Sequence, residues 1–103
     1  MICVTASIMI GNSDNKLTQC QWSEFVAAAR AEISHHAQQT FFQGFSATDA
    51  PWQNACWVVS VNSDELDELK ACLARLAQDN GQDSIALVLG KSELILSLQG
   101  AAR

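Results

Sequence analysis

Three aspartates stand in turn-rich stretches of the chain, and their chemistry is the first to consider. They are Asp14, Asp49 and Asp83, each with Asn or Gln close by in the sequence. Carboxylate oxygens are hard ligands that suit Mg²⁺, and a bound Mg²⁺ can support hydrolysis. Nothing in their spacing favours a metal over ordinary turns, where Asp and Asn side chains bond to the backbone. We therefore predict no metal site and no cofactor, and keep a carboxylate site as an alternative.

The histidines and cysteines do not form a catalytic set. His35 and His36 are adjacent, so on a helix they point about 100° apart instead of toward one metal ion. We expect them to interact with the dipole at the end of a helix. No cysteines form a Cys-x-x-Cys pair, and none has zinc-ligand spacing with a histidine. The four are predicted to be free thiols: Cys3, Cys20, Cys56 and Cys72.

Length and charge limit the class of protein. The chain has 103 residues, enough for one domain with one core, and 49% of them are hydrophobic. Its formal net charge is −5, with only 6 Lys and Arg. Nucleic acids and anionic membranes need clustered basic residues, so neither is an expected partner. No apolar run is long enough to span a bilayer, and residues 2–10 lack the basic start of a signal peptide, so a cytoplasmic location is predicted.

The first half of the chain predicts a strand, a helix and two more strands. Apolar residues alternate with small ones over residues 2–10, as in a strand with one face on a core. Thr18, followed by Gln21, has the pattern of a capping box at the start of a helix that ends near residues 35–38. Strands are expected over residues 41–47 and 55–61, and Trp22 and Trp57 are expected in the core.

The second half predicts a helix and a hairpin. The helix begins at Asn62 or Ser63 and ends at Asn80-Gly81, with leucines at helical spacing between. Residues 84–89 and 93–98 are expected to form two short strands of a hairpin. The whole order predicts a single α+β domain over residues 1–103. Its expected fold is the ferredoxin-like split β-α-β-β-α-β, an antiparallel sheet with two helices on one face and an extra C-terminal strand.

This topology brings three polar loops, residues 11–17, 47–54 and 79–84, to one end of the sheet. Three interpretations of that end are open: structural turns, a recognition surface for a protein or small ligand, and a carboxylate site for Mg²⁺. Trp52 would be the anchor of a recognition surface, because aromatic residues ringed by polar groups dominate many interfaces. The predicted binding residues are Asn12, Asp14, Asp49, Trp52, Gln53, Asn54, Gln82 and Asp83.

The sheet face away from the helices is expected to carry short and apolar side chains. Its predicted members are Cys3, Thr5, Ser7, Met9, Cys56, Val58 and Ser60. An exposed apolar patch needs a cover, so a homodimer through this face is an expectation. The predicted hairpin is an alternative cover for an edge of the sheet.

Three segments resemble those of a family of small uncharacterised proteins from bacteria and their phages. They are Ile-Gly-Asn-Ser-Asp at residues 10–14 with Lys-Leu-Thr-Gln at 16–19, Asp-Ala-Pro-Trp-Gln-Asn-Ala-Cys-Trp at 49–57, and Gln-Asp-Ser-Ile-Ala at 82–86. The resemblance covers most of the chain, and its most specific part is residues 51–57. It implies no catalytic residues, since no activity is established for the family. A phage association would imply inhibition of a host protein, by analogy of class only.

The sequence therefore favours a non-enzymatic module that binds a protein partner, in the form of a phage or mobile-element inhibitor of a host defence protein. One alternative is a small enzyme or ligand-binding domain that uses the carboxylates at the loop end. The other is a dimeric scaffold protein.

Overall fold

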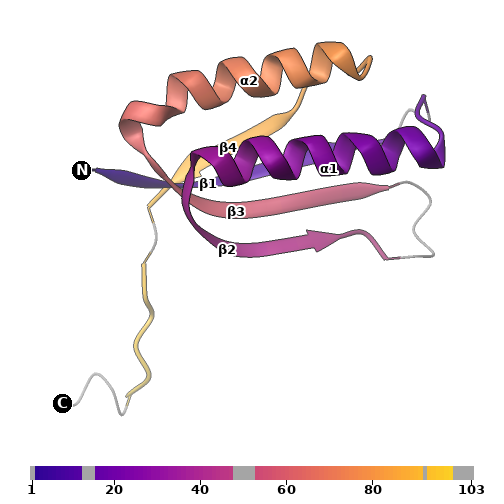
Figure 1. Ribbon diagram of the computed structural model, residues 1–103. Helices are drawn as coiled ribbons and strands as arrows, with labels where there is room; N and C mark the ends of the chain where they lie inside the picture. Colours follow the sequence, from indigo (N-terminus) through magenta and orange to yellow (C-terminus); the bar gives the residue numbers. More distant parts are fainter. Residues whose placement is uncertain (1, 13–15, 48–52, 92, 99–103) are drawn as a thin grey trace.

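The computed structural model describes residues 2–12, 16–47, 53–91 and 93–98. Its elements are, in order, β1 (Cys3–Gly11), α1 (Gln19–His36), β2 (Ala37–Phe45), β3 (Asn54–Asn62), the 3-10 helix η1 (Ser63–Glu65), α2 (Leu66–Asp79) and β4 (Ala86–Gly90). The strands form one antiparallel sheet in the order β2-β3-β1-β4, and both helices lie on one face of it (Figure 1). The predicted ferredoxin-like α+β fold is confirmed.

The core lies between the helices and the alternate residues of the two central strands. The helix-facing side chains of β1 and β3 are buried, and they are Ala6, Ile8, Ile10, Ala55, Trp57, Val59 and Val61. The helices cover them with the predicted stripes, chiefly Trp22, Phe25, Val26, Ala29, Ile33, Leu69 and Leu73. Trp57 keeps a partner for its indole, because Nε1 donates to Gln43 Oε1 at 2.9 Å. The alternation that predicted these two strands is therefore the pattern that builds the core.

Helix α1 begins at the predicted capping box. The N–H of Gln21 donates to Thr18 Oγ1 at 3.2 Å, and the N–H of Thr18 donates to Gln21 Oε1 at 2.9 Å. Each side chain thus satisfies a backbone donor at the helix start that has no partner within the helix. The box sets where α1 begins, and so where the loop after β1 ends.

Helix α2 ends where predicted, but it begins at Leu66, because a 3-10 turn, η1, occupies the predicted start. Asn62 caps the 3-10 turn before it, since Asn62 Oδ1 accepts from the N–H of Asp64 at 3.0 Å. At the far end Gly81 has a φ of 65°, in the left-handed region that favours glycine. The N–H of Gln82 then donates to the Ala77 carbonyl at 2.8 Å, which turns the chain back toward the sheet.

The second strand differs from its predicted range of 41–47. β2 starts at Ala37, directly after α1, and ends at Phe45. Residues 38–40 are polar and exposed, so no alternation marks them; pairing with β3 makes them a strand. A register shift between Thr40 and Phe42 leaves Phe41 as an extra residue, and such a bulge interrupts the period of two.

The predicted extra C-terminal strand, residues 93–98, is not formed. The last strand is β4, and beyond Gly90 the described chain has no strand and runs away from both layers (Figure 1, yellow). The prediction was wrong because a strand-like sequence indicates only a tendency to pair, whereas a strand also needs a neighbour. In this arrangement no strand of the described residues lies beside residues 93–98.

Replacing Thr18 by Ala is expected to lower the free energy of unfolding by about 1 kcal/mol, because the N–H of Gln21 loses its acceptor. Thr18→Ser keeps the hydroxyl and should cost only a few tenths of that amount. Urea denaturation of the two variants beside the wild type measures the difference. If Thr18→Ala and Thr18→Ser lost the same unfolding free energy, the hydroxyl would not be the cap.

Candidate functional site

Side-chain amides tie together the loops at the end of the sheet where β1 finishes. Asn12 is 3% exposed. Its Oδ1 accepts from the N–H of Leu17 at 3.1 Å, while its Nδ2 donates to the Leu17 carbonyl at 3.0 Å and to Gln53 Oε1 at 3.2 Å. Its backbone N–H donates to the Gln53 carbonyl at 2.8 Å. Asn12 therefore closes the loop after β1 and joins it to the residue before β3.

Gln53 extends this network to the first helix. Its Nε2 donates to Gln19 Oε1 at 2.8 Å, in addition to the bond that its Oε1 accepts from Asn12. Both hydrogens of the Asn12 amide are used inside the protein. The network supports a structural role for these two predicted binding residues, since buried polar groups require partners.

The other described members of the predicted surface meet at one cavity. Asn54, Gln82 and Asp83 line an open hollow of about 350 Å³ together with Met9 and Gly11. The topology thus brings the loop before β3 and the loop before β4 together, as the sequence predicts. Asp14, Asp49 and Trp52 lie outside the described residues, so the carboxylate site and the tryptophan anchor stay predictions.

We expect Asn12→Ala to destabilise the fold by about 2 kcal/mol, because it leaves the backbone groups of Leu17 without a partner. Asn54→Ala is the matched control, since that side chain is exposed, and should change stability by less than about 0.5 kcal/mol. Thermal and urea unfolding of both variants give the comparison. A neutral Asn12→Ala would contradict the structural role of this amide.

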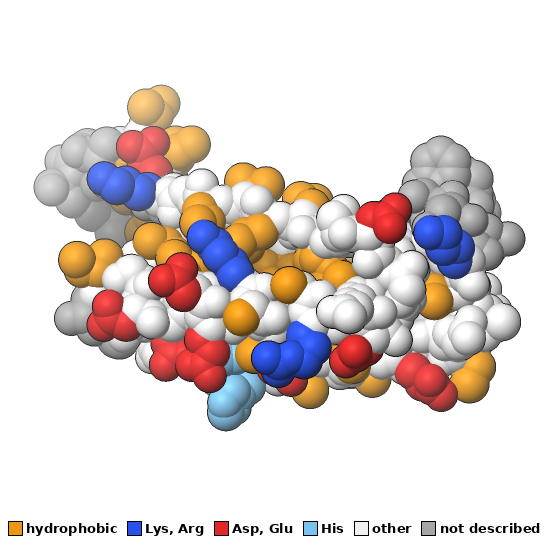
Figure 2. All heavy atoms as spheres, turned by 90° about the horizontal axis from the view of Figure 1, so that it is seen from above, with side chains coloured by type: hydrophobic (Ala, Val, Ile, Leu, Met, Phe, Trp, Pro, Cys, Tyr) orange, Lys and Arg blue, Asp and Glu red, His pale blue; other side chains and the backbone are white. Residues whose placement is uncertain are grey.

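The uncovered face of the sheet is larger and more uniform than the sequence indicates. The strand register assigns to it Cys3, Thr5, Ser7, Met9 and Gly11 of β1, Asn54, Cys56, Val58, Ser60 and Asn62 of β3, Gln39, Phe42 and Gly44 of β2, and Ala86, Val88 and Gly90 of β4. We call this set the open face. None of these residues is charged. The charged side chains seen on the helix side in Figure 2 therefore have no counterpart at these strand positions.

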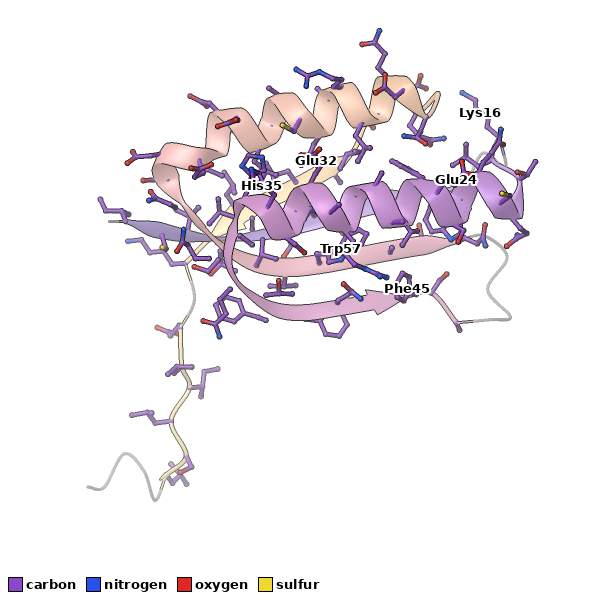
Figure 3. The ribbon with its side chains drawn as sticks, viewed as in Figure 1. Lys16, Glu24, Glu32, His35, Phe45 and Trp57 are labelled. Atoms are coloured by element: carbon purple, nitrogen blue, oxygen red, sulfur yellow. The ribbon has the colours of Figure 1, made fainter. Side chains whose placement is uncertain are left out.

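Phe42 makes the β2 margin of the open face aromatic, whereas the register places Phe45, opposite Ala55, on the other face of the strand. A Cβ atom at position 44 would lie 2.5 Å from Phe42 Cζ, so Gly44 leaves room for the phenylalanine ring to lie across the strand. Both phenylalanines line a shallow hollow of about 280 Å³ with Met9 and Cys56, and Phe45 lies at the end of β2 (Figure 3). Sequence reasoning missed Phe42 and Val88 as members of the face, because their orientation depends on the bulge and on the pairing of β4.

A second cluster lies at the opposite end of the helices, around a histidine that is 4% exposed. The Nδ1 of His36 is 3.0 Å from Glu65 Oε2, and its Nε2 is 3.9 Å from Glu32 Oε2. Glu32 lies between the two helices (Figure 3). The contact with Glu65 ties the end of α1 to η1. The sequence predicted only that the histidines interact with the dipole at the end of a helix, and it did not predict these carboxylate partners. The four-residue spacing of Glu32 and His36 was the only signal in the sequence.

Within this cluster Cys72 of α2 approaches the same groups. Glu32, His36 and Cys72 bring a carboxylate oxygen, a ring nitrogen and a sulfur within 4.8 Å of one another. Such a set suits Zn²⁺ better than Mg²⁺, and the bond of His36 to Glu65 is the kind that orients a ligand histidine. The same contacts equally hold α1 to η1 and α2 with no ion, so they do not by themselves make a metal site.

The surroundings raise the pKa of the Cys72 thiol. Burial is the larger cause, because it disfavours the thiolate, and the nearby Glu32 carboxylate adds to the effect.

Alkylation should therefore be slower at Cys72 than at the exposed Cys3, at a pH of about 8 where the thiolate is the reactive form. Glu32→Gln removes a charge that raises the pKa, so it should speed the reaction of Cys72 and leave Cys3 unchanged. Peptide mass spectrometry of iodoacetamide-treated protein resolves the four cysteines. An unchanged rate at Cys72 in the Gln variant would contradict the electrostatic contribution of Glu32.

Comparison with known proteins assigns no family to this chain. No family model and no curated protein matches the sequence. Among solved structures, the chain is similar to the uncharacterized protein TM1266 from Thermotoga maritima. The TM-score is 0.46 and the sequence identity 7%, over 85% of this chain and 92% of that chain. Neither of the two α-helices among the described residues has the length and hydropathy of a membrane-spanning segment.

Proposed function

We propose that this protein is a non-enzymatic binding module that docks on another protein through the open face. The observation that carries the proposal is the absence of charge from every described strand position of that face. Apolar side chains are exposed there at the same time: Met9 is 38% exposed, and Phe42 and Val88 are each 55% exposed.

A surface of this kind is costly to leave in water. The chain carries 17 charged residues per hundred, and a face that spans four strands would be expected to hold several of them. Burying apolar area stabilises a complex, whereas burying an unpaired charge opposes it. The composition of the open face is therefore that of a surface adapted to contact.

The same argument limits the chemistry of the partner. A charged side chain pressed against this face would find no opposite charge and would lose its water. The partner is thus a protein whose own contact surface is apolar or carries neutral hydrogen-bonding groups. Asn54, Gln82 and Asp83 lie beside Met9 and Ala86 in one hollow and form a polar rim at the edge of the face.

Inhibition of a host protein by a phage-encoded module is one form of this activity. It rests on the resemblance to small phage proteins, and the open face supplies a contact surface of suitable chemistry. A cytoplasmic location belongs to the same proposal.

Photo-crosslinking from the open face tests the proposal. A photo-reactive phenylalanine analogue at position 42 should crosslink a specific protein in cells of the native host, and Met9→Lys in the same chain should abolish the product. The same analogue at Ile2, which is 73% exposed and precedes the sheet, should give no such product. With the purified partner, Met9→Lys should weaken binding at least about tenfold, or about 1.4 kcal/mol.

The controls decide the result. Circular dichroism and thermal unfolding must show that Met9→Lys remains folded. The proposal fails if positions 42 and 2 crosslink the same proteins, or if Met9→Lys binds the purified partner as well as the wild type does.

A further inference from the structure

Residues 93–98 expose more apolar side chain than any other described segment. Leu94 is 86% exposed, Ile95 91%, Leu96 64% and Leu98 93%. The Cα radius of gyration is 15.7 Å, against about 13 Å for a compact chain of this length. A run of four large apolar residues with strand-forming character is an unfavourable segment to hold in water.

The outer edge of β4, with the hollow beside it, could accept this segment as a further strand. β4 is the last strand of the sheet on its side, so the outer edge of β4 has backbone groups that no described strand pairs. Beside that edge, α2 and β4 enclose an open hollow of about 530 Å³, and its apolar lining includes Leu73, Ala74, Ala77, Ile85 and Leu87. A fifth strand on β4 would lie along this hollow.

The alternation of the segment agrees with the two faces of β4. On β4, Leu87 and Leu89 face the helices, since they pair with Ile8 and Ala6, while Val88 lies on the open face. An antiparallel strand that places Leu96 opposite Leu87 puts Leu94 and Leu98 on the helix side as well, in the hollow. Ile95 then stands opposite Val88, and no apolar residue of the segment is misplaced.

The connection to β4 does not favour this pairing within one chain. Gly90 is part of β4, paired with Thr5, and it has no positive φ. In this register a hairpin would turn on Lys91 and Ser92 alone. Two-residue hairpin turns need left-handed residues, hence Asn, Asp or Gly, and neither residue is of that kind. Short connections that strain a hairpin are the ones that favour exchange between chains.

We propose that residues 93–98 of one copy form the fifth strand on β4 of a second copy, in a reciprocal strand exchange that makes the protein a dimer. The occupant of the hollow between α2 and β4 is thus this chain's own apolar segment. The exchange covers a free edge and buries Leu94, Leu96 and Leu98. It uses a different surface from the open face, which each subunit keeps.

The mass in solution is the first test. Light scattering coupled to size exclusion should give twice the 11.2 kDa of one chain. Leu96→Asp places a charge in the hollow and should weaken the dimer at least about a hundredfold. Ile95→Asp is the matched control: it is the neighbouring large apolar residue, but it would stand on the open side of the strand, so the dimer should persist.

Mixing two variants separates exchange from other modes of association. Ala74→Asp alters an exposed residue of the hollow and should also give a monomer. In a mixture of Leu96→Asp with Ala74→Asp, one intact segment can meet one intact hollow. We expect a mixed dimer that neither variant forms alone.

Substitutions in the two residues between β4 and the segment, Lys91 and Ser92, give an independent test. The double substitution Lys91→Asn and Ser92→Gly supplies a favourable hairpin turn, and should convert the dimer into a monomer. Hydrogen exchange should show residues 93–98 protected in this monomer, with the segment now on its own β4.

A wild-type chain that is monomeric at every concentration overturns the proposal, whether or not its segment is protected. So does a dimer that survives both Leu96→Asp and Ala74→Asp. If Met9→Lys alone separates the subunits, the open face is the dimer contact and strand exchange is wrong. Because Met9 and Leu96 lie on different surfaces, failure of the exchange leaves the proposed docking through the open face testable.

Discussion

The pairing of β1 with β3 constrains every other part of this fold. The two strands are joined residue by residue from Cys3 and Asn62 to Gly11 and Asn54, with no shift in register. Since side chains alternate along a strand, this pairing divides both strands into a helix-facing set and an open set. A slip of one residue on β1 would turn Ser7 toward the helices and Ile8 toward water. The burial of the helix-facing set therefore holds the register.

The same division explains why so much apolar surface remains exposed. Two helices suffice to cover one face of a four-stranded sheet, and each supplies a single apolar stripe. No described element covers the other face or the outer edge of β4. Proposals for both surfaces follow from this asymmetry: the open face has the composition of a contact surface, and residues 93–98 have the pattern of the strand that β4 lacks.

The polar residues of the loops fall into two groups: those whose side chains are hydrogen-bonded within the protein, and those whose side chains are exposed. Asn12 and Gln53 lie where the chain leaves and enters the central strands. The Asn12 amide supplies hydrogen-bond partners for the backbone of Leu17, and the Gln53 amide joins Asn12 to Gln19. Asn54 and Asp83 remain exposed beside the open face, where they can contact another molecule. Loop composition alone does not separate these two roles, because turns and binding surfaces use the same residue types.

The histidine cluster shows the same dependence on distant residues. His36 follows Glu32 by one helical turn, but Glu65 and Cys72 reach it only because η1 and α2 pack beside the end of α1. Two adjacent histidines at a helix end do not by themselves predict contacts with Glu65 or Cys72. The contact between the buried His36 and the partly exposed Glu65 joins the two halves of the fold at the end opposite the amide network.

Local patterns in the sequence determined the capping box at Thr18, the stop at Gly81, the two apolar stripes and the alternation of the central strands, and these were enough for the order of elements and the fold. Each depends on residues within a turn or two of one another. The start of β2 at Ala37, the bulge at Phe41, the uncharged extent of the open face and the fate of residues 93–98 were decided by the tertiary structure. Those features depend on which strand lies alongside, and a strand without a neighbour is not formed however strongly its residues favour one.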